Sequence, residues 1–238
     1  MALFDFPREP EPEGMEDEED VEAYTSSAAE KHLERLDGEF VKQIETMKVR
    51  SGIALDVGTG PGSIPSMLSL RVPGLTIIGL DISLTMLGKA KEAIREAKVT
   101  ERLFLVCADT RKLPFRDGTF DMVFSNSLLH HLPDPLPCLD EISRVAGADG
   151  AVIIRDLRRP SRLTYRLHVA YFGRRYTGRM KDLFEASVRS SFTHGEVKNL
   201  LSSSTLTGCS AIKWGSQYIV IARPPGRAVS PPGNRTLM

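Results

Sequence analysis

A short glycine-rich segment is the part of this sequence whose residue types and spacing most directly allow chemistry. It reads Leu55-Asp-Val-Gly-Thr-Gly-Pro-Gly62 and contains the end of an apolar run. Glycines let the backbone turn tightly and let a ligand lie against the main chain, and a helix that begins after such a turn presents unpaired N–H groups. A plain tight turn would carry the same glycines, so the segment alone does not establish a binding site.

An acidic residue at the end of the next apolar run strengthens the binding interpretation. Asp81 lies 21 residues after Gly60, and a carboxylate at a strand end can accept hydrogen bonds from ribose hydroxyls. The dinucleotide fingerprint requires G-x-G-x-x-G, whereas the third glycine here falls one position early, at Gly62. This spacing, with Asp56 inside the preceding strand, disfavours NAD and an NAD-type oxidoreductase and favours adenosylmethionine. The alternative role of Asp81 is to cap a helix that begins near Leu84.

Apolar periodicity predicts the elements that must position these residues. Short apolar runs typical of buried strands alternate with the stripes of amphipathic helices. Helices are predicted over about 29–48, 63–71, 87–97, 136–146 and 194–201, and strands over 53–57, 75–80, 103–107, 120–124, 151–154, 209–214 and 217–222. We therefore expect an α/β fold with a doubly wound, Rossmann-like, mostly parallel seven-stranded sheet. Gly215-Ser216 predicts that it ends in a C-terminal antiparallel hairpin.

Composition narrows the classes of function. Lys plus Arg equal Asp plus Glu at 31 each, so no net field draws the protein toward nucleic acid or a membrane. The three cysteines are scattered without a CxxC pair, so we expect neither a disulfide framework nor a metal site. The N-terminus lacks signal-peptide features, and no apolar run approaches the ~20 residues of a membrane span. The cytoplasm is the expected compartment.

Uneven charge indicates the domain boundaries. Residues 9–22 carry nine carboxylates and no base, so we expect 1–22 to be an acidic, disordered arm that contributes little to stability. The folded domain is expected over 23–223, followed by a Pro/Gly-rich tail over 224–238. Residues 155–181 carry nine Lys or Arg interleaved with aromatic residues. Such a segment can bind single-stranded nucleic acid, form a helical cap over a substrate, or be a solvated face.

Four segments, in order along the chain, together resemble the class I S-adenosylmethionine-dependent methyltransferases. The likeness is greatest to the small-molecule branch that includes the ubiquinone/menaquinone C-methyltransferases. The segments are LDVGTGPG (55–62), GLDIS (79–83), CADTRKLPF (107–115) and FDMVFSNSLLHHLPDP (120–135). The resemblance covers about residues 30–157 and is specific for the family rather than for a substrate. The turn from Arg144 to Gly150 departs from the family's usual R-V-L-K-P-G-G.

The resemblance implies a shared role for the residues that match: contact with S-adenosylmethionine at the carboxyl ends of the strands. The implied contacts are Gly58, Thr59 and Gly60 with Asp56 nearby at the methionine and ribose, Asp81 at the ribose hydroxyls, Ile82 at one face of adenine, Asp109 with the Ala108 backbone at the adenine amine, and Ser125 and Asn126 at the sulfonium and substrate entrance. Asp109 has the alternative of being a surface loop acid.

Catalytic residues are less well indicated, because a sulfonium already activates the methyl group and alignment and desolvation supply most of the acceleration. His130 and His131 follow the fourth strand and could take a proton from an acceptor. Capping or packing is their alternative role. Tyr24 precedes the first helix, where related enzymes often close a flap over the cofactor, but it could equally pack as a loop residue.

The function implied by the resemblance is methyl transfer from S-adenosylmethionine to a small-molecule acceptor. The acceptor, its O, N, S or C atom and the oligomeric state stay open. Residues 125–128 read Ser-Asn-Ser-Leu instead of the Asn/Asp-Pro-Pro-aromatic motif of amino-group nucleic-acid methylases, so we expect no nucleic-acid partner. The alternatives are a non-catalytic scaffold of the same fold and an RNA methyltransferase. We expect the helical insert 157–204 to cap the substrate, with 157–192 over the carboxyl edge of the sheet.

Overall fold

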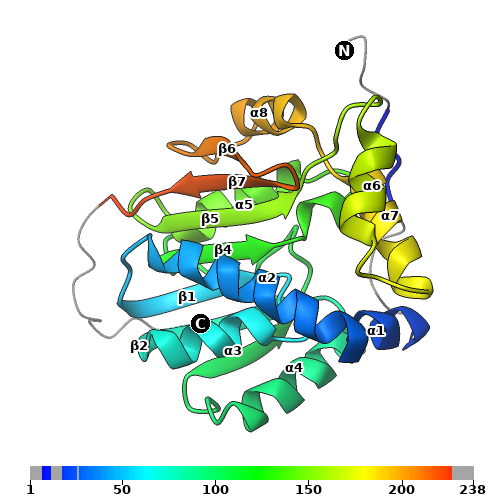
Figure 1. Ribbon diagram of the computed structural model, residues 1–238. Helices are drawn as coiled ribbons and strands as arrows, with labels where there is room; N and C mark the ends of the chain where they lie inside the picture. The colour runs from blue at the N-terminus through cyan, green and yellow to red at the C-terminus, as the bar shows by residue number, and fades with distance from the viewer. Residues whose placement is uncertain (1–6, 12–17, 26, 227–238) are drawn as a thin grey trace.

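A seven-stranded sheet forms the centre of the computed structural model, which describes residues 7–11, 18–25 and 27–226. Its strands are ordered β3-β2-β1-β4-β5-β7-β6 (Figure 1). Their bounds are β1 Ser51–Val57, β2 Gly74–Asp81, β3 Leu103–Cys107, β4 Met122–Asn126, β5 Ala151–Leu157, β6 Ser210–Trp214 and β7 Tyr218–Arg223. Strands β1 to β5 pair in parallel, and β7 pairs antiparallel with both β5 and β6. The expected fold class is confirmed.

Helices cover both faces of the sheet. Their bounds are α1 Glu18–Thr25, α2 Ser27–Glu45, α3 Ser63–Arg71, α4 Leu84–Glu96, the short 3-10 helix η1 Leu129–His131, α5 Leu136–Ala146, α6 Tyr165–Gly173, α7 Arg179–Ser190 and α8 His194–Ser203. One core cluster joins α2, α3 and α4 to the sheet, and another joins α5 and α8 to it. Successive residues of β1 enter different clusters, Ala54 one and Leu55 the other. Burial on both faces explains why the strands read as continuous apolar runs.

Three helices gather at the edge where the parallel strands end. The arrowheads of β4 and β5 point toward α1, α6 and α7 (Figure 1). A small apolar cluster that contains Val169, Met180 and Phe184 holds α6 and α7 together. The structure thus places segment 157–192 over the carboxyl edge, as expected, while α8 packs against a face of the sheet.

Part of the basic run 155–181 is occupied inside the molecule. Arg155 is 2% exposed, and its guanidinium lies 4.6 Å from the centre of the Phe40 ring. Arg159 is also buried and pairs with Glu196 at 2.6 Å. The remaining members that lie on the surface are Arg162, Arg166, Arg174, Arg175, Lys181 and Arg179, which bonds to Asp20. The run therefore combines a buried structural part with an exposed basic face.

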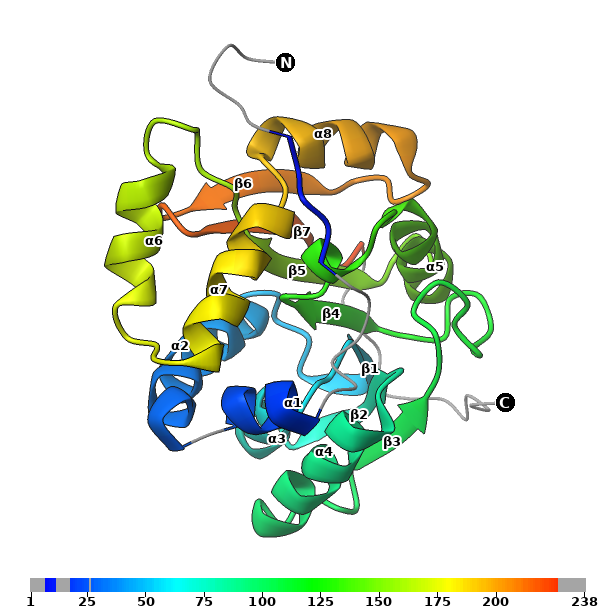
Figure 2. The ribbon, with the colours of Figure 1, turned by 90° about the vertical axis from the view of Figure 1, so that its right-hand side faces the viewer.

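Residues 7–11 correct the expectation that 1–22 is a disordered arm. They run beside α7 across the carboxyl edge (Figure 2), where the Glu9 N–H donates to the Arg189 carbonyl at 3.3 Å. The Arg8 guanidinium lies 4.2 Å from the centre of the Phe192 ring. It donates to four carbonyl oxygens, those of His130 at 2.9 Å, Leu132 at 2.7 Å, Pro133 at 2.9 Å, and Ser190. Composition alone could not reveal this docking, because one arginine supplies most of it.

The other expectations for the two ends of the chain are tested only in part. Residues 18–22 also depart from the disordered arm, because α1 begins at Glu18. Residues 1–6, 12–17 and most of the expected tail, 227–238, lie outside the described residues. Among the helices that are described, none combines the length and apolarity needed to cross a membrane.

Replacing Arg8 should therefore destabilise the fold. Arg8→Ala removes the donor for four carbonyl groups, and hydrogen bonds to a charged donor contribute roughly 1–3 kcal/mol each before solvent compensates the exposed ones. We expect a loss of about 1–3 kcal/mol in unfolding free energy, and a melting temperature lower by roughly 2–10 °C. Thermal melts of Arg8→Ala beside Arg162→Ala, an exposed arginine, measure this. Equal melting temperatures for the two variants would show that the arm is not docked in solution.

Candidate active site

A cavity of about 730 Å3 opens at the carboxyl edge of the sheet. The loops after β1, β2 and β4 supply one end of it, and α2 and α7 supply the other. Most of the residues expected to contact the cofactor line this one cavity, namely Asp56, Gly58, Thr59, Gly60, Asp81, Ile82, Asp109 and Asn126. The carboxyl-end rule for open α/β sheets therefore brings four separate sequence segments together.

The glycine loop has a backbone that other residues would strain. Gly58, Gly60 and Gly62 have φ of +74°, +53° and +79°, a region that costs glycine little. A Cβ at Gly58 would lie 2.9 Å from Leu128 Cδ1, and one at Gly62 would lie 2.9 Å from Ala90 Cβ. A Cβ at Gly60 would meet no atom within 4 Å. The loop thus presents bare main chain and open space to the cavity, which fits a ligand held against the backbone.

Asp81 links this loop to the helix after β2. Its Oδ2 accepts from the Gly60 N–H at 2.8 Å, and its Oδ1 accepts from the Ser83 N–H at 3.0 Å. Each carboxylate oxygen has a second lone pair that can accept from a ligand hydroxyl. The sequence analysis gave ribose binding and capping of the helix near Leu84 as alternatives; the structure shows that Asp81 also orders the loop that would hold the cofactor.

Asp56 lies beneath the same loop. It is buried, and its Oδ2 accepts from the Thr59 hydroxyl at 2.8 Å. Burial raises the pKa of Asp56 to about 8, and the nearby Asp81 and Asp37 carboxylates add to the rise. At neutral pH the carboxyl is therefore mainly protonated, a form that can donate as well as accept hydrogen bonds.

The adenine end of the expected site is more open. Ile82 is 48% exposed although it lines the cavity, so its side chain is available to cover a flat ring. Asp109 is bound by Arg111, whose guanidinium lies 2.9 Å from Asp109 Oδ2. Hydrogen bonds from Arg111 lower the pKa of Asp109 against a small opposing effect of burial. The carboxylate is thus ionised and oriented.

One expected contact, Ser125, does not line the cavity. Ser125 is fully buried, and its hydroxyl donates to the Val57 carbonyl at 2.7 Å. Successive strand residues point in opposite directions, so Asn126 lines the cavity and Ser125 does not. The Ala108 N–H donates to the Asp81 carbonyl at 3.1 Å; contact of the Ala108 backbone with the adenine amine, which would use the carbonyl oxygen, stays a prediction.

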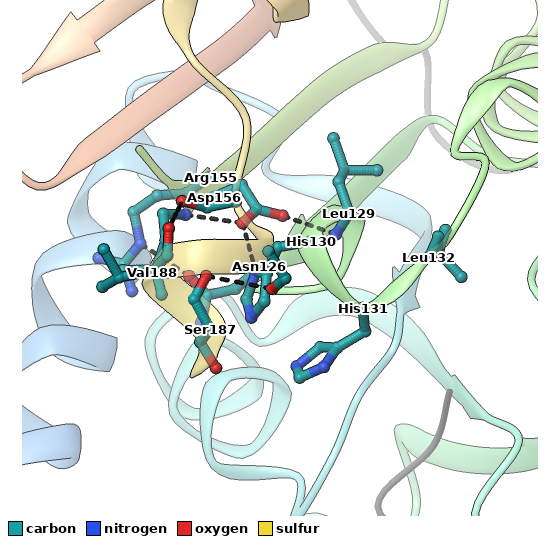
Figure 3. A network of polar contacts seen from close by, with 12 residues as sticks. Asn126, Leu129, His130, His131, Leu132, Arg155, Asp156, Ser187 and Val188 are labelled. Atoms are coloured by element: carbon teal, nitrogen blue, oxygen red, sulfur yellow. Dashed lines mark hydrogen bonds and ion pairs between the residues drawn. The ribbon is translucent and has the colours of Figure 1, made fainter. Parts of the chain in front are cut away.

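His130 forms a buried pair with Asp156, which the sequence interpretation missed. Figure 3 shows the two side chains facing each other, and His130 Nδ1 lies 2.5 Å from Asp156 Oδ1. Asp156 also accepts the Leu129 N–H. Burial alone would lower the pKa of His130, but the Asp156 and Glu11 carboxylates outweigh it and raise the pKa. Asp156 lies near the carboxyl end of β5 and could have been found by the same rule that located Asp81.

The structure describes the side chain of His131 but not that of Tyr24. The His131 ring lines the cavity and is turned away from Asp156 (Figure 3). Burial, and then the neighbouring His130, lower the pKa of His131 well below its usual value. Tyr24 lies in α1, but its side chain is outside the described part of the molecule, so its role as a flap residue stays a prediction.

The far end of the cavity is mainly apolar and was not predicted residue by residue. Its lining residues come from α2, β5, the loop before α7, α7 and the β6–β7 hairpin: Leu33, Glu34, Leu36, Asp37, Leu157, Tyr176, Met180, Leu183, Phe184, Gln217 and Tyr218. Of the two carboxylates among them, Asp37 is buried, and burial raises its pKa to about 6, partly offset by Arg155. The end opposite the glycine loop can therefore take an apolar molecule with a small number of polar groups.

The buried Asp56 predicts a pH dependence of stability. Its pKa rises from 3.8 to about 8 on folding, so between these values the folded protein keeps a proton that the unfolded chain releases. This group therefore makes stability fall as pH rises from about 4 to about 8. Asp56→Asn keeps an oxygen for Thr59 and removes the titration, so its melting temperature relative to wild type should rise across this interval. A difference that stays constant with pH in thermal melts would contradict the burial of an ionisable carboxyl.

Comparison with known proteins shows which families the sequence is similar to. Residues 55–154 match the methyltransferase domain family. The chain is 35% identical over 103 residues to a demethylmenaquinone methyltransferase of Lactiplantibacillus plantarum, a match that covers 43% of each protein. It is 31% identical over 116 residues to a malonyl-[acyl-carrier protein] O-methyltransferase of Legionella pneumophila, covering 49% of this chain and 40% of that one. The chain thus spans less than half the length of these relatives.

A solved structure agrees with the fold. The crystal structure of a SAM-dependent methyltransferase from Aquifex aeolicus superposes with a TM-score of 0.56 at 20% identity, covering 76% of this chain and 87% of that one. The domain match, the two relatives and the sheet order confirm the resemblance carried by the four segments. Residues 55–154 are thus a methyltransferase domain by their sequence match, and the sheet around them has the fold of the Aquifex aeolicus SAM-dependent methyltransferase.

Proposed function

We propose that this protein binds S-adenosylmethionine and transfers its methyl group to a small molecule. The observation that carries the proposal is the shared cavity. The Gly58–Gly62 loop, Asp81 and Asp109 line one end, and an apolar chamber under α7 lines the other. A methyl donor and a methyl acceptor must both occupy one space for the methyl group to pass directly between them.

The cofactor end has a group for each part of a nucleoside. Asp81 retains acceptor capacity for ribose hydroxyls while it fixes Gly60, and the exposed Ile82 suits the face of adenine. The ionised Asp109 suits the amine of adenine. Open space at Gly60 leaves the main chain free to approach the amino-acid portion. Asn126 remains the candidate nearest the sulfonium, and the Ala108 carbonyl remains a candidate for the adenine amine, whereas Ser125 is not proposed as a contact.

The sulfonium of the cofactor supplies an activated methyl group and leaves as a neutral thioether. The protein's part is then to align the acceptor, exclude water and accept any proton that the acceptor loses. His130 and His131 lie where the glycine-loop end meets the chamber. They are the candidates for the proton, and which of them acts depends on the acceptor.

The acceptor itself is proposed only as a class. Tyr176, Met180, Phe184 and Tyr218 give the chamber an apolar wall, which favours an acceptor with a flat or aliphatic body. The two relatives described above are named for different acceptors, so their names do not select one here, nor the O, N, S or C atom.

The other classes of function receive less support. A scaffold without catalysis needs neither three glycines at positive φ nor a carboxylate that fixes them. An RNA substrate receives less support because two arginines of the basic run, Arg155 and Arg159, are buried and bonded inside the molecule. We propose a cytoplasmic location, which the three unpaired cysteines support. The number of subunits stays open.

Asp81→Ala tests the cofactor assignment. Each lost charge-assisted hydrogen bond to ribose costs roughly 1.5–3 kcal/mol, so we expect S-adenosylmethionine affinity to fall by about 10–100-fold. The melting temperature should fall as well, because Gly60 and Ser83 lose their acceptor. Asp81→Asn, which keeps one oxygen, should lose less of both. Calorimetric titration and thermal melts on the same samples give the two values.

Asp134→Ala is the matched control. Asp134 also accepts a backbone N–H two residues ahead, that of Leu136 at 3.0 Å, but it does not line the cavity. This variant should lose stability and keep its affinity for the cofactor. If Asp81→Ala behaves in the same way, Asp81 is a helix cap and the cofactor assignment fails.

A further inference from the structure

We propose that Glu11, His130 and His131 form a binding site for a divalent transition-metal ion at the edge of the cavity. The site goes beyond methyl transfer, since its binding does not depend on which reaction the domain performs. It joins the docked segment 7–11 to the short helix η1. No metal was expected from the sequence, because the carboxylate ligand stands far from the two histidines along the chain and in a segment expected to be disordered.

The three side chains bring possible ligand atoms close together. Glu11 Oε1 is 3.9 Å from His130 Nε2, and Glu11 Oε2 is 3.6 Å from His131 Nδ1. One ligand atom of each residue lies within 4.8 Å of the other two. Two ligands each ~2.1 Å from a tetrahedral ion stand about 3.4 Å apart, so binding requires these atoms to approach by up to roughly 1.4 Å. Side-chain rotation can supply this change.

The surroundings orient these ligands as in protein metal sites. The Asp156 carboxylate forms a hydrogen bond with Nδ1 of His130 and so directs Nε2 toward Glu11. Asp156 is itself fixed by the N–H groups of Leu129 and Leu157. The Ser190 hydroxyl donates to Glu11 Oε1 at 2.6 Å. A carboxylate that orients a histidine ligand and a hydrogen bond that orients a carboxylate ligand are the usual outer contacts of a bound metal.

Burial distinguishes this group from an ordinary surface cluster. The side chains of Glu11 and His130 are 9% and 2% exposed, and that of His131 is 25% exposed. A carboxylate removed from water needs a compensating positive charge. A divalent ion held by the two imidazole rings would neutralise Glu11 and Asp156 together.

The ligand set also indicates which metals the site would take. Two imidazole nitrogens and one carboxylate suit Zn2+, Fe2+ or Co2+, whereas Mg2+ and Ca2+ prefer oxygen ligands throughout. Three protein ligands leave at least one coordination position open. Both histidines line the cavity, so the open position would be taken by water or by an anionic oxygen of a molecule in the chamber.

The experiment is a titration of the full chain, freed of metal with a chelator, with Co2+ alone and without S-adenosylmethionine. We expect uptake of one equivalent, seen as the visible absorption of a site of low coordination number and as heat in calorimetry. Glu11→Gln and His131→Asn should each weaken uptake at least tenfold, and Asp156→Asn, which keeps the ligands but not their orientation, by about 10–100-fold. Zn2+ should compete and Mg2+ should not.

Glu9→Gln is the matched control, because Glu9 lies on the same arm but pairs with Arg189 outside the cluster; it should bind Co2+ as wild type does. Circular dichroism checks that each variant is folded. If Glu11→Gln does not fold, His131→Asn, which changes the most exposed of the three side chains, provides the test. Absence of stoichiometric uptake, or uptake that Glu11→Gln and His131→Asn leave unchanged, overturns the site and leaves a protonated His130 between two carboxylates. Co2+ uptake without S-adenosylmethionine binding would leave the site standing and remove the proposed function instead.

Discussion

The Asp81 carboxylate is the contact on which the rest of the site depends. Its two oxygens hold the N–H groups of Gly60 and Ser83, and thereby fix the loop after β1 against the start of α4. Because β1 and β2 are parallel neighbours, both loops open on the same edge of the sheet, and one side chain can order them together. The same carboxylate faces the cavity, so under the proposed function one residue would both order the loop and bind the ribose. On that proposal, replacing Asp81 by a neutral cap should weaken cofactor binding.

Local patterns were sufficient for the scaffold. The apolar runs and the helical stripes place the strands and helices within a few residues of the observed bounds. Strands buried on both faces must consist almost entirely of apolar residues, so they are easy to recognise in a sequence. The glycine loop and Asp81 were recognisable because backbone geometry restricts the residue types allowed there. An error arose where a position depends on what lies beside it: Ser125 is one residue from Asn126, yet its hydroxyl bonds to the Val57 carbonyl and does not face the cavity.

Contacts between distant segments account for what sequence could not provide. The arm over 7–11 looks like a solvated acidic segment, but Arg8 finds four carbonyl oxygens around η1 and the end of α7. No periodicity or motif in the sequence predicts that residues 7–11 dock there. The apolar wall of the chamber could not be predicted from the sequence either. Tyr176, Met180 and Phe184 look like ordinary core positions of a helical segment. The basic run after β5 was ambiguous for the same reason, because the partners of Arg155, Arg159 and Arg179 lie in other elements.

The cavity therefore has two ends of different origin: one built from sequence-recognisable loops of the sheet, the other from the arm and the helices that follow β5. A crystal structure of the full chain grown with S-adenosylhomocysteine tests this account most directly. The account predicts that both ribose hydroxyls lie within hydrogen-bonding distance of Asp81, with the adenine beside Ile82 and the thioether directed toward the chamber lined by Tyr176 and Phe184. A nucleoside bound elsewhere, or bound in the cavity with Asp81 directed away from the ribose, would contradict it.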